Sequence, residues 1–518
     1  MTLPIALPDE TRHPSHHLED ERPTKRVRFD ADSLLTKDLG TKSDASLVRR
    51  HPLGVRPSGN ALTSPVNLKP ACGSFASLPD ELLATLLEIL EAKDLLLLGG
   101  TCRALHAFTR NEELWRALFV ESSPSTFSWR GTWRSTNLAQ DPIKEPRVDC
   151  SNLFSDTLHR PFFCAHVPLN HYADNIPASN QIPRLLDLTP AEFEADWVNR
   201  PFILTAPVKE WPIYRTWSAE RLLEKHADTP FRAESVDWPL TTYIDYMTTN
   251  ADESPLYLFD HSFAEKMSLT ISSQPNESAD YWPPTAFGDD LFNVLGEQRP
   301  DHRWLIVGPA RSGSTFHKDP NATSAWNAVL KGRKYWILFP ASPAIPPPPG
   351  VYVSEDQSEV TSPLSIAEWL LGFHAEARET KGCVEGICGE GEVVHVPSGW
   401  YHLVLNLEGS IAVTQNFVPR RRVGAVLQFL RDQRGSISGF GREVGDPFGL
   451  FVERLGEFDG GLLREGMGEL ERLGKFKGGR GKWEELTKPA VQDEDEAEVG
   501  GGFSFGFGGD DDDDVEVE

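Results

Sequence analysis

The chain has 518 residues, 39% of them hydrophobic and 14 of them tryptophan, which excludes disorder throughout and predicts two or three domains. No stretch approaches about 18 consecutive apolar residues and the start lacks a signal-peptide pattern, so no membrane partner is expected. The formal net charge is −26, but 12 acidic residues and no basic one lie between positions 493 and 518, so a large share of this charge belongs to one tail.

Residues 1–72 are rich in Pro, Ser, Thr, Asp and His without an apolar period, and are predicted to form a disordered N-terminal arm. Within this arm, residues 22–28 (RPTKRVR) form a basic patch. Short basic runs in such arms act as nuclear localisation signals, and the alternative is an incidental solvated cluster. If the patch is a nuclear localisation signal, we expect the protein in the nucleus, with the cytoplasm as an additional location.

Leucines recur at helical spacing in residues 73–122, which predicts a small helical bundle. The segment carries LPDELL, then CRAL, then NEELW, and in this order it resembles an F-box. The resemblance implies docking to the Skp-type adaptor of a cullin-RING ubiquitin ligase, with Leu78, Pro79 and Leu82 at the interface. Residues 123–184 are aromatic and loop-rich, and are predicted to pack between this domain and the next.

Residues 185–419 are predicted to form the largest domain. An amphipathic helix is expected over 185–197, followed by short helical runs and by strand-like runs such as SPLYLFD at 254–260.

Two residues of this domain point to a metal site. If the segment around His317 and Asp319 is a strand, both side chains lie on one face, because positions i and i+2 point the same way. A His-x-Asp pair with a second histidine is the facial triad of non-haem Fe(II) oxygenases. His402 is the preferred third ligand because it follows the turn at 397–399 and opens a β-rich run, whereas His395, in an apolar run, competes with it.

Lys334 lies in an aromatic and aliphatic strand-like run, 333–339, after a Lys331-Gly332 turn. Burying such a lysine is unfavourable without an anionic partner, and a dicarboxylate cosubstrate provides one. The alternative is an edge-strand lysine that faces solvent.

Four segments then carry a family resemblance: RWLIVGPARSGSTFHKDP (303–320), SAWNAVLKGRKYWILFP (324–340), VPSGWYHLVLNL (396–407) and IAVTQNF (411–417). Together they resemble the Jumonji-C domain of Fe(II)/2-oxoglutarate oxygenases, in the branch once called the phosphatidylserine receptor, a bifunctional arginine demethylase and lysyl hydroxylase. The resemblance implies a mainly β catalytic domain, a cupin-like double-stranded β-helix with flanking helices. It also implies Fe(II), 2-oxoglutarate and O2 as cofactor and cosubstrates.

Carried over by position, the iron ligands are His317, Asp319 and His402, and the 2-oxoglutarate contacts are Asn327, Lys334 and Thr414. Tyr257 and Asn416 match further positions that line the pocket. Ser314 stands where this branch has threonine, and it keeps the hydroxyl while losing only a methyl group. Since no ligand position is missing, the resemblance implies an active enzyme.

The remaining segments are predicted from composition and periodicity. Residues 365–377 predict a helix in which His374 is exposed, and Cys383 and Cys388 beyond it are interpreted as free loop thiols in a reducing compartment. Residues 420–476 predict helices that support the large domain. Residues 477–518 are Gly-rich and acidic, and predict a disordered tail that either attracts basic partners or only keeps the protein soluble.

We therefore expect a dioxygenase that modifies basic, Lys/Arg-rich proteins. Lysyl hydroxylation and arginine or histone N-demethylation both remain open, and the resemblance favours lysyl hydroxylation slightly. The competing hypothesis is a non-catalytic F-box substrate receptor that uses the large domain only for recognition. Direct nucleic-acid binding is not expected, because the sequence shows no basic stripe interleaved with aromatic residues.

Overall fold

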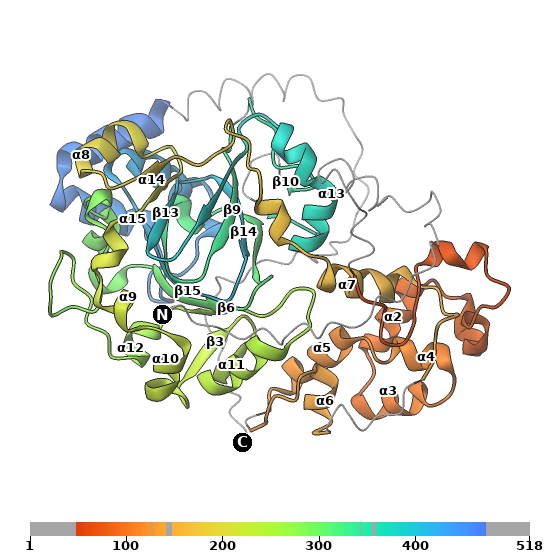
Figure 1. Ribbon diagram of the computed structural model, residues 1–518. Coiled ribbons are helices and arrows are strands. Elements are labelled where there is room, and N and C mark those ends of the chain that lie inside the picture. Colours follow the sequence, from red (N-terminus) through yellow and green to blue (C-terminus); the bar gives the residue numbers. More distant parts are fainter. Residues whose placement is uncertain (1–47, 125, 141–147, 343, 355–358, 473–518) are drawn as a thin grey trace.

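The computed structural model describes residues 48–124, 126–140, 148–342, 344–354 and 359–472. A β-rich body carries a helical lobe on one side, drawn in orange in Figure 1. The predicted fold class is confirmed: a mainly β domain with flanking helices, together with a small all-helical domain.

The β-rich body is built from two sheets that face each other. The strands of the larger sheet, in spatial order, are β1 (Arg184–Leu185), β2 (Phe202–Leu204), β13 (Glu392–Val396), β8 (Ser324–Lys331), β15 (Ser410–Phe417), β6 (Arg303–Gly308), β5 (Leu258–Asp260), β3 (Pro230–Ala233) and β4 (Val236–Pro239). Those of the smaller sheet are β12 (Val384–Cys388), β9 (Lys334–Phe339), β14 (Tyr401–Asn406) and β7 (Gly313–His317). The β1–β2 pair is parallel, and the other pairings within these sheets are antiparallel.

The space between the sheets is filled by one apolar cluster. Val329 and Val394 enter it from the larger sheet, and Trp336, Leu338 and Val404 enter it from the smaller one. The strands that enclose it are buried on both faces, which is why their sequences read as continuous apolar runs.

Helix α13 (Ile366–Glu379) covers the outer face of the smaller sheet and begins with a capping box between Ser365 and Glu368. The prediction that His374 is exposed is wrong: the residue is 1% exposed, and its Nε2 lies 2.9 Å from the hydroxyl oxygen of Tyr335. Cys383 and Cys388 are free thiols as expected, but both are buried, and Cys388 belongs to strand β12 rather than to a loop.

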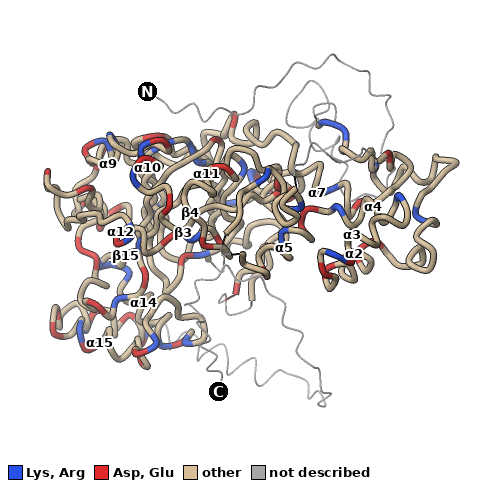
Figure 2. Tube along the Cα trace, turned by 90° about the horizontal axis from the view of Figure 1, so that it is seen from below, with Lys and Arg blue, Asp and Glu red and all other residues tan. Residues whose placement is uncertain are grey.

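Helices α14 (Val423–Asp432) and α15 (Pro447–Phe458) and a helix over 460–472 follow the last strand. They pack with Leu291 and Phe292 in a separate apolar cluster. Figure 2 shows basic and acidic positions interspersed along these outer helices. Within the described ranges, no helix is both long enough and apolar enough to cross a membrane.

The helical lobe includes the short helices α2 (Asp80–Glu88), α3 (Ala92–Gly99), α4 (Arg103–Phe108) and α5 (Glu112–Ser122). Leu83, Leu87 and Trp115 form part of its core, whereas Leu82 and Leu97 are 57% and 64% exposed. Helix α2 begins directly after Pro79.

The segment that precedes the lobe is better ordered than expected. The predicted disordered arm ended at residue 72, but the 3-10 helices Ser58–Leu62 and Lys69–Ser77 pack against the lobe, with the backbone N–H of Leu68 donating to the carbonyl of Asn152. The boundary near 72 is therefore wrong for residues 48–72. The basic patch at 22–28 and the tail from 477 onward lie outside the described residues.

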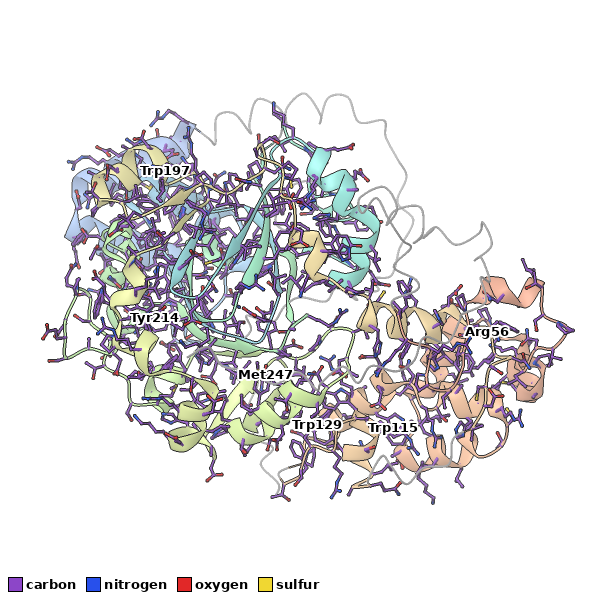
Figure 3. All side chains as sticks on the ribbon, in the orientation of Figure 1. Arg56, Trp115, Trp129, Trp197, Tyr214 and Met247 are labelled. Carbon is purple, nitrogen blue, oxygen red and sulfur yellow. The ribbon has the colours of Figure 1, made fainter. Side chains whose placement is uncertain are left out.

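An aromatic cluster joins the lobe to the body. Trp133, on the short helix α6 (Trp133–Asn137), lies 5.7 Å from both Trp238 and Tyr246 of the body, measured between ring centroids. Phe119 of helix α5 lies 6.0 Å from Trp238 in an edge-to-face arrangement. Trp129, labelled in Figure 3, also belongs to this junction, since its ring centroid lies 5.0 Å from that of Tyr246. The lobe therefore rests on the body through packed side chains.

Candidate active site

His317 and His402 lie opposite each other on adjacent strands. They form a direct cross-strand pair between β7 and β14, and their ring centroids are 4.1 Å apart. Burial lowers the pKa of each imidazole to about 4, helped at His317 by the neighbouring His402 and opposed there by Asp319. Both rings are therefore neutral near pH 7, which is the state that binds a metal.

Asp319 stands just beyond the end of β7 rather than within it. Its backbone is nevertheless extended (φ −64°, ψ 146°), so the carboxylate stays near the two imidazoles, and His317 interacts with it electrostatically. Burial raises the pKa of Asp319 to about 6, opposed by the charge of His317 and by a hydrogen bond from the Asn416 amide. Its Oδ2 is buried and has no hydrogen-bond partner in the described part of the chain.

The donor atoms fit a divalent metal. The Nδ1 of His317 donates to the carbonyl of Thr315 at 2.8 Å and the Nδ1 of His402 donates to that of Trp400 at 3.2 Å, which leaves each Nε2 as a lone-pair donor. With the orphaned oxygen of Asp319 this gives two nitrogen ligands and one carboxylate. The three donor atoms do not all lie within 4.8 Å of one another, a spacing that the group Cys164, Glu253 and Glu368 does meet.

Lys334 is buried at the opposite end of the interior. It opens strand β9, lies between β12 and β14, is 2% exposed, and pairs with Asn406 across the strand. The edge-strand interpretation is therefore wrong. Burial lowers the pKa of its ammonium group to about 8, with a small opposing effect from Cys388. No described side chain forms an ion pair with this ammonium.

Further polar groups share this interior. Asn327 on β8 and Thr414 on β15 form a direct cross-strand pair. The Oδ1 of Asn327 is buried and has no hydrogen-bond partner among the residues that the structure describes, and the Thr414 hydroxyl donates to the carbonyl of Trp326 at 2.8 Å. Two residues along β15, the Nδ2 of Asn416 donates to the Thr323 hydroxyl at 3.0 Å. An unpaired acceptor in a buried cavity is expected where a ligand supplies the missing donor or a bridging group.

Ser314 and Tyr257 also border the interior. Ser314 is buried on β7 opposite Val404, which belongs to the interior cluster. Tyr257 precedes β5, and burial raises the pKa of its hydroxyl, with a further contribution from Glu234. A Cβ placed on Gly308 would lie 3.1 Å from the Cβ of Tyr257 and 2.7 Å from the Nδ2 of Asn406, so Tyr257 lies at the Lys334 end of the interior.

His395 is not part of this site. It pairs with Trp326 on β8, so it faces away from the interior that its neighbour Val394 shares with Asn327. Its ring packs among Phe193, Phe202 and other phenylalanines, and its Nδ1 donates to the carbonyl of Arg200 at 3.0 Å. It is a core histidine.

Trp336 is an interior residue that sequence reasoning missed. Its indole stacks on His402, with centroids 6.1 Å apart, and its Nε1 is buried without a hydrogen-bond partner among the described residues. Its position could have been predicted from the sequence, because Trp336 is two positions after Lys334 on one strand and its side chain therefore lies on the same face of the sheet.

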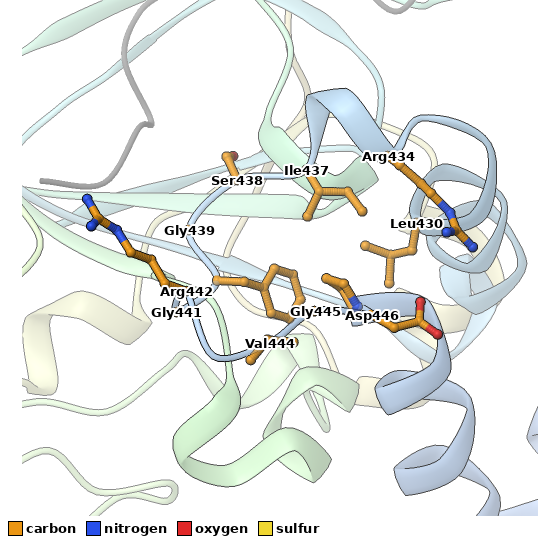
Figure 4. A pocket seen from close by; sticks show the side chains of 12 residues that line it. Leu430, Arg434, Ile437, Ser438, Gly439, Gly441, Arg442, Val444, Gly445 and Asp446 are labelled. Carbon is orange, nitrogen blue, oxygen red and sulfur yellow. The ribbon is translucent and has the colours of Figure 1, made fainter. Parts of the chain in front are cut away.

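A separate pocket lies beside the loop that carries Asp319. It has a volume of about 380 Å³ and is formed by the connection between α14 and α15, including Ile437, Phe440 and Arg434 (Figure 4). Asn321 fixes this connection to the ligand loop, because its side-chain amide donates to the carbonyl of Ser438 at 2.9 Å and accepts from its N–H at 3.2 Å.

Comparison with protein families matches residues 190–422 to a cupin-like domain and residues 75–121 to an F-box-like domain. These ranges coincide with the β-rich body and the helical lobe.

Named relatives share much of the chain. The arginine-specific demethylase JMJ22 of Arabidopsis thaliana is 38% identical over 391 residues, which covers 73% of this chain and 75% of the relative. The bifunctional arginine demethylase and lysyl-hydroxylase psr-1 of Caenorhabditis elegans is 37% identical over 245 residues, 45% of this chain and 59% of the relative. The 2-oxoglutarate and iron-dependent oxygenase JMJD4 of Danio rerio is 26% identical over 337 residues, 60% of this chain and 71% of the relative.

Proposed function

Because the chain belongs to the Jumonji-C family of cupin-like Fe(II)- and 2-oxoglutarate-dependent oxygenases and also carries an F-box-like domain, we propose that it is a dioxygenase acting on basic side chains of proteins. The observation that carries this most directly is the buried Lys334 ammonium, which has no anionic partner in the described chain. A buried charge without a counterion is unfavourable, so the site is built for an anion that arrives with the cosubstrate.

In this proposal His317, Asp319 and His402 hold Fe(II). The Nε2 atoms of the two histidines carry the lone pairs that bind a metal, the Oδ2 of Asp319 is the third donor, and the Nδ1 contacts to backbone carbonyls fix both imidazoles in the metal-binding tautomer. The bound metal and cosubstrate together supply the oxidising chemistry, which the side chains of the protein cannot perform.

The protein holds and orients the cosubstrate. The Lys334 ammonium binds the distal carboxylate of 2-oxoglutarate, and Thr414 and Asn327 contact it from the larger sheet. The apolar walls, including Val394 and Trp336, exclude bulk water from the reacting end. Tyr257 closes the Lys334 end of the pocket.

The substrate class follows from the relatives. Hydroxylation of a lysine carbon gives a stable product, whereas hydroxylation of an N-methyl group gives a product that breaks down to formaldehyde and free amine. Both outcomes need a basic side chain next to the same metal. Since relatives are named as arginine and lysine demethylases and as a lysyl-hydroxylase, we retain both reactions, on a basic protein substrate.

A second function rests on the helical lobe. Leu82, Ile89 and Leu97 are 57%, 80% and 64% exposed, which is unusual for aliphatic side chains on three turns of one small domain. We propose that these side chains, with Leu78 and Pro79, bind a Skp-type adaptor and thereby a ubiquitin ligase. This face is separate from the aromatic contact with the body, so both activities are compatible.

Two assays test these functions separately. Purified protein with Fe(II) is expected to convert 2-oxoglutarate to succinate in the presence of lysine- or methylarginine-containing basic peptides, and His317→Ala or Asp319→Ala abolishes turnover. Turnover that survives both substitutions contradicts the assigned site. Co-purification of a Skp-type adaptor, lost in a Leu82→Asp/Leu97→Asp variant that retains turnover, supports the ligase role; a stable protein that never captures the adaptor argues against it.

A further inference from the structure

One arginine of the F-box-like domain reaches into the oxygenase body. The guanidinium of Arg116, on helix α5, donates to the carbonyl oxygen of Ser254 at 3.1 Å and pairs with the Oε2 of Glu234 at 3.2 Å. The two side chains of this ion pair are 18% and 31% exposed, so they are better shielded from solvent than an ordinary surface pair. The contact links the two domains that the family comparison separates.

Glu234 connects Arg116 to Tyr257. It forms the turn between β3 and β4 with a left-handed φ of 52°, a conformation that is unfavourable for glutamate unless its surroundings hold it. Its second oxygen, Oε1, accepts a hydrogen bond from the backbone N–H of Tyr257 at 3.3 Å. Arg116 thus fixes the segment before β5 at two points, directly at Ser254 and through Glu234 at Tyr257.

Tyr257 is where this segment meets the cosubstrate pocket. It lies against Gly308 and near Asn406, and Asn406 is the cross-strand partner of Lys334. Its hydroxyl makes no hydrogen bond to any described residue, so it is available to a ligand. A shift of the segment by a fraction of an ångström would move this hydroxyl.

The charges around Arg116 make its role sensitive to substitution. Glu113, Glu234 and Asp252 all lie close enough to interact with this single guanidinium. Without it, Glu234 would be a partly buried carboxylate with no cation, and it would either take up a proton or turn toward solvent. Turning outward releases the N–H of Tyr257.

We propose that Arg116 is a positioning residue for the 2-oxoglutarate pocket, holding Tyr257 in place through Glu234 and Ser254. The F-box-like domain is then part of the wall of the oxygenase site as well as a surface for an adaptor. This inference rests on the proposed 2-oxoglutarate-dependent function.

The test compares full-length wild type with Arg116→Met, Arg116→Lys and the control Arg103→Met, which changes an exposed arginine on helix α4 of the same domain. Binding of 2-oxoglutarate is measured by calorimetry with Mn(II) in place of Fe(II), and KM and kcat are measured with Fe(II). Arg116→Met is expected to raise both the Kd and the KM for 2-oxoglutarate roughly tenfold, the equivalent of about 1.4 kcal/mol. It leaves kcat nearly unchanged, Arg116→Lys restores part of the affinity, and Arg103→Met behaves as wild type.

A double-substitution cycle with Tyr257→Phe tests whether Arg116 affects 2-oxoglutarate binding through Tyr257. If Arg116 acts through Tyr257, Arg116→Met has little further effect in the Tyr257→Phe background. Wild-type affinity in Arg116→Met, or an equal loss with and without the tyrosine hydroxyl, overturns the inference.

A second variant tests the inference where Arg116→Met does not fold. Glu234→Gln removes the negative charge at this position but keeps an oxygen that accepts from the N–H of Tyr257. It is expected to give a smaller loss of 2-oxoglutarate affinity. Absence of 2-oxoglutarate binding by wild type contradicts the proposed function instead.

Discussion

The indole of Trp336 stacks on the imidazole of His402, with ring centroids 6.1 Å apart and planes inclined by 29°. One face of the His402 ring is therefore held by Trp336 on strand β9, and its Nδ1 is held by the hydrogen bond to the carbonyl of Trp400. Such outer contacts set the direction in which a histidine presents its free nitrogen.

Trp336→Leu is expected to weaken metal binding by about tenfold, because it removes the stacking partner of His402. Trp336→Phe keeps an aromatic face and is expected to lose much less. Mn(II) affinity, followed by electron paramagnetic resonance, measures the change, and the control is Trp197→Leu, whose ring packs on Phe202 in the aromatic core around His395. Equal affinities for wild type and Trp336→Leu would show that the ring contact does not orient the ligand.

Lys334→Met is expected to stabilise the protein in the absence of cosubstrate, because it replaces a buried, unpaired ammonium group by an apolar side chain of similar length. The same substitution removes the rise in Tm that 2-oxoglutarate gives to wild type. Thermal unfolding with and without the cosubstrate and Mn(II) measures both effects. A Lys334→Met protein that is still stabilised by 2-oxoglutarate contradicts the assigned carboxylate contact.

The same lysine predicts a pH dependence of cosubstrate affinity. Burial lowers the pKa of Lys334 to about 8 in the free protein, and only the protonated form attracts a carboxylate. Affinity for 2-oxoglutarate is therefore expected to be constant below pH 7 and to fall as the pH rises through 8. Calorimetric titrations across this range measure the effect, and Lys334→Arg, which stays charged, is expected to show no such fall.

The site was predictable from the sequence where short motifs determine it. Alternation along a strand places Lys334 and Trp336 on one face, and the spacing of His317 and Asp319 kept their side chains together even though the strand ends at His317. The preference for His402 over His395 depended on a turn signal, and the structure places His395 in the core. Which strands pair is a long-range property that none of these local patterns contains.

The errors came from residues whose burial is decided by tertiary contacts. His374 was predicted to be exposed as the simplest interpretation of a polar residue on its helix, yet Tyr335 and Glu385 surround it with polar groups that make its burial possible. Residues 48–72 looked disordered because their order comes from packing on the lobe rather than from periodicity. The contact from Arg116 to Glu234 spans 118 positions of sequence and had no local signal.

Acidic residues at the junction of the two domains predict a loss of stability with rising pH. Burial raises the pKa of Glu112 and of Glu234 to about 7, opposed at Glu112 by hydrogen bonds from Arg134 and Trp133 and at Glu234 by the charge of Arg116. The folded-state pKa of each carboxyl group lies above the unfolded value of about 4.3. Their contribution to the free energy of unfolding is therefore fully present below about pH 4.3 and is lost as the pH rises through 7. Tm is expected to fall between about pH 4.5 and pH 7 and to level off above that range, and Glu112→Gln is expected to flatten this slope. An unchanged slope in that variant assigns the effect to other groups.

The aromatic cluster predicts that the lobe and the body unfold together. Trp133 is fully buried, and its Nε1 donates to Asp252 at 2.8 Å while the Tyr246 hydroxyl donates to the same Oδ2 atom at 2.7 Å. Trp133→Ala removes the packing against Trp238 and leaves Asp252 with one donor fewer, and it is expected to lower the free energy of unfolding by about 3–5 kcal/mol.

Because the cluster belongs to both domains, the loss should appear as a single transition at lower temperature, seen alike by near-UV circular dichroism and by calorimetry. The control is Tyr352→Ala, since that ring is 71% exposed and its removal is expected to change stability by less than about 0.5 kcal/mol. If Trp133→Ala instead gives two transitions, one of them at the wild-type temperature, the domains are independent and the lobe does not stabilise the oxygenase.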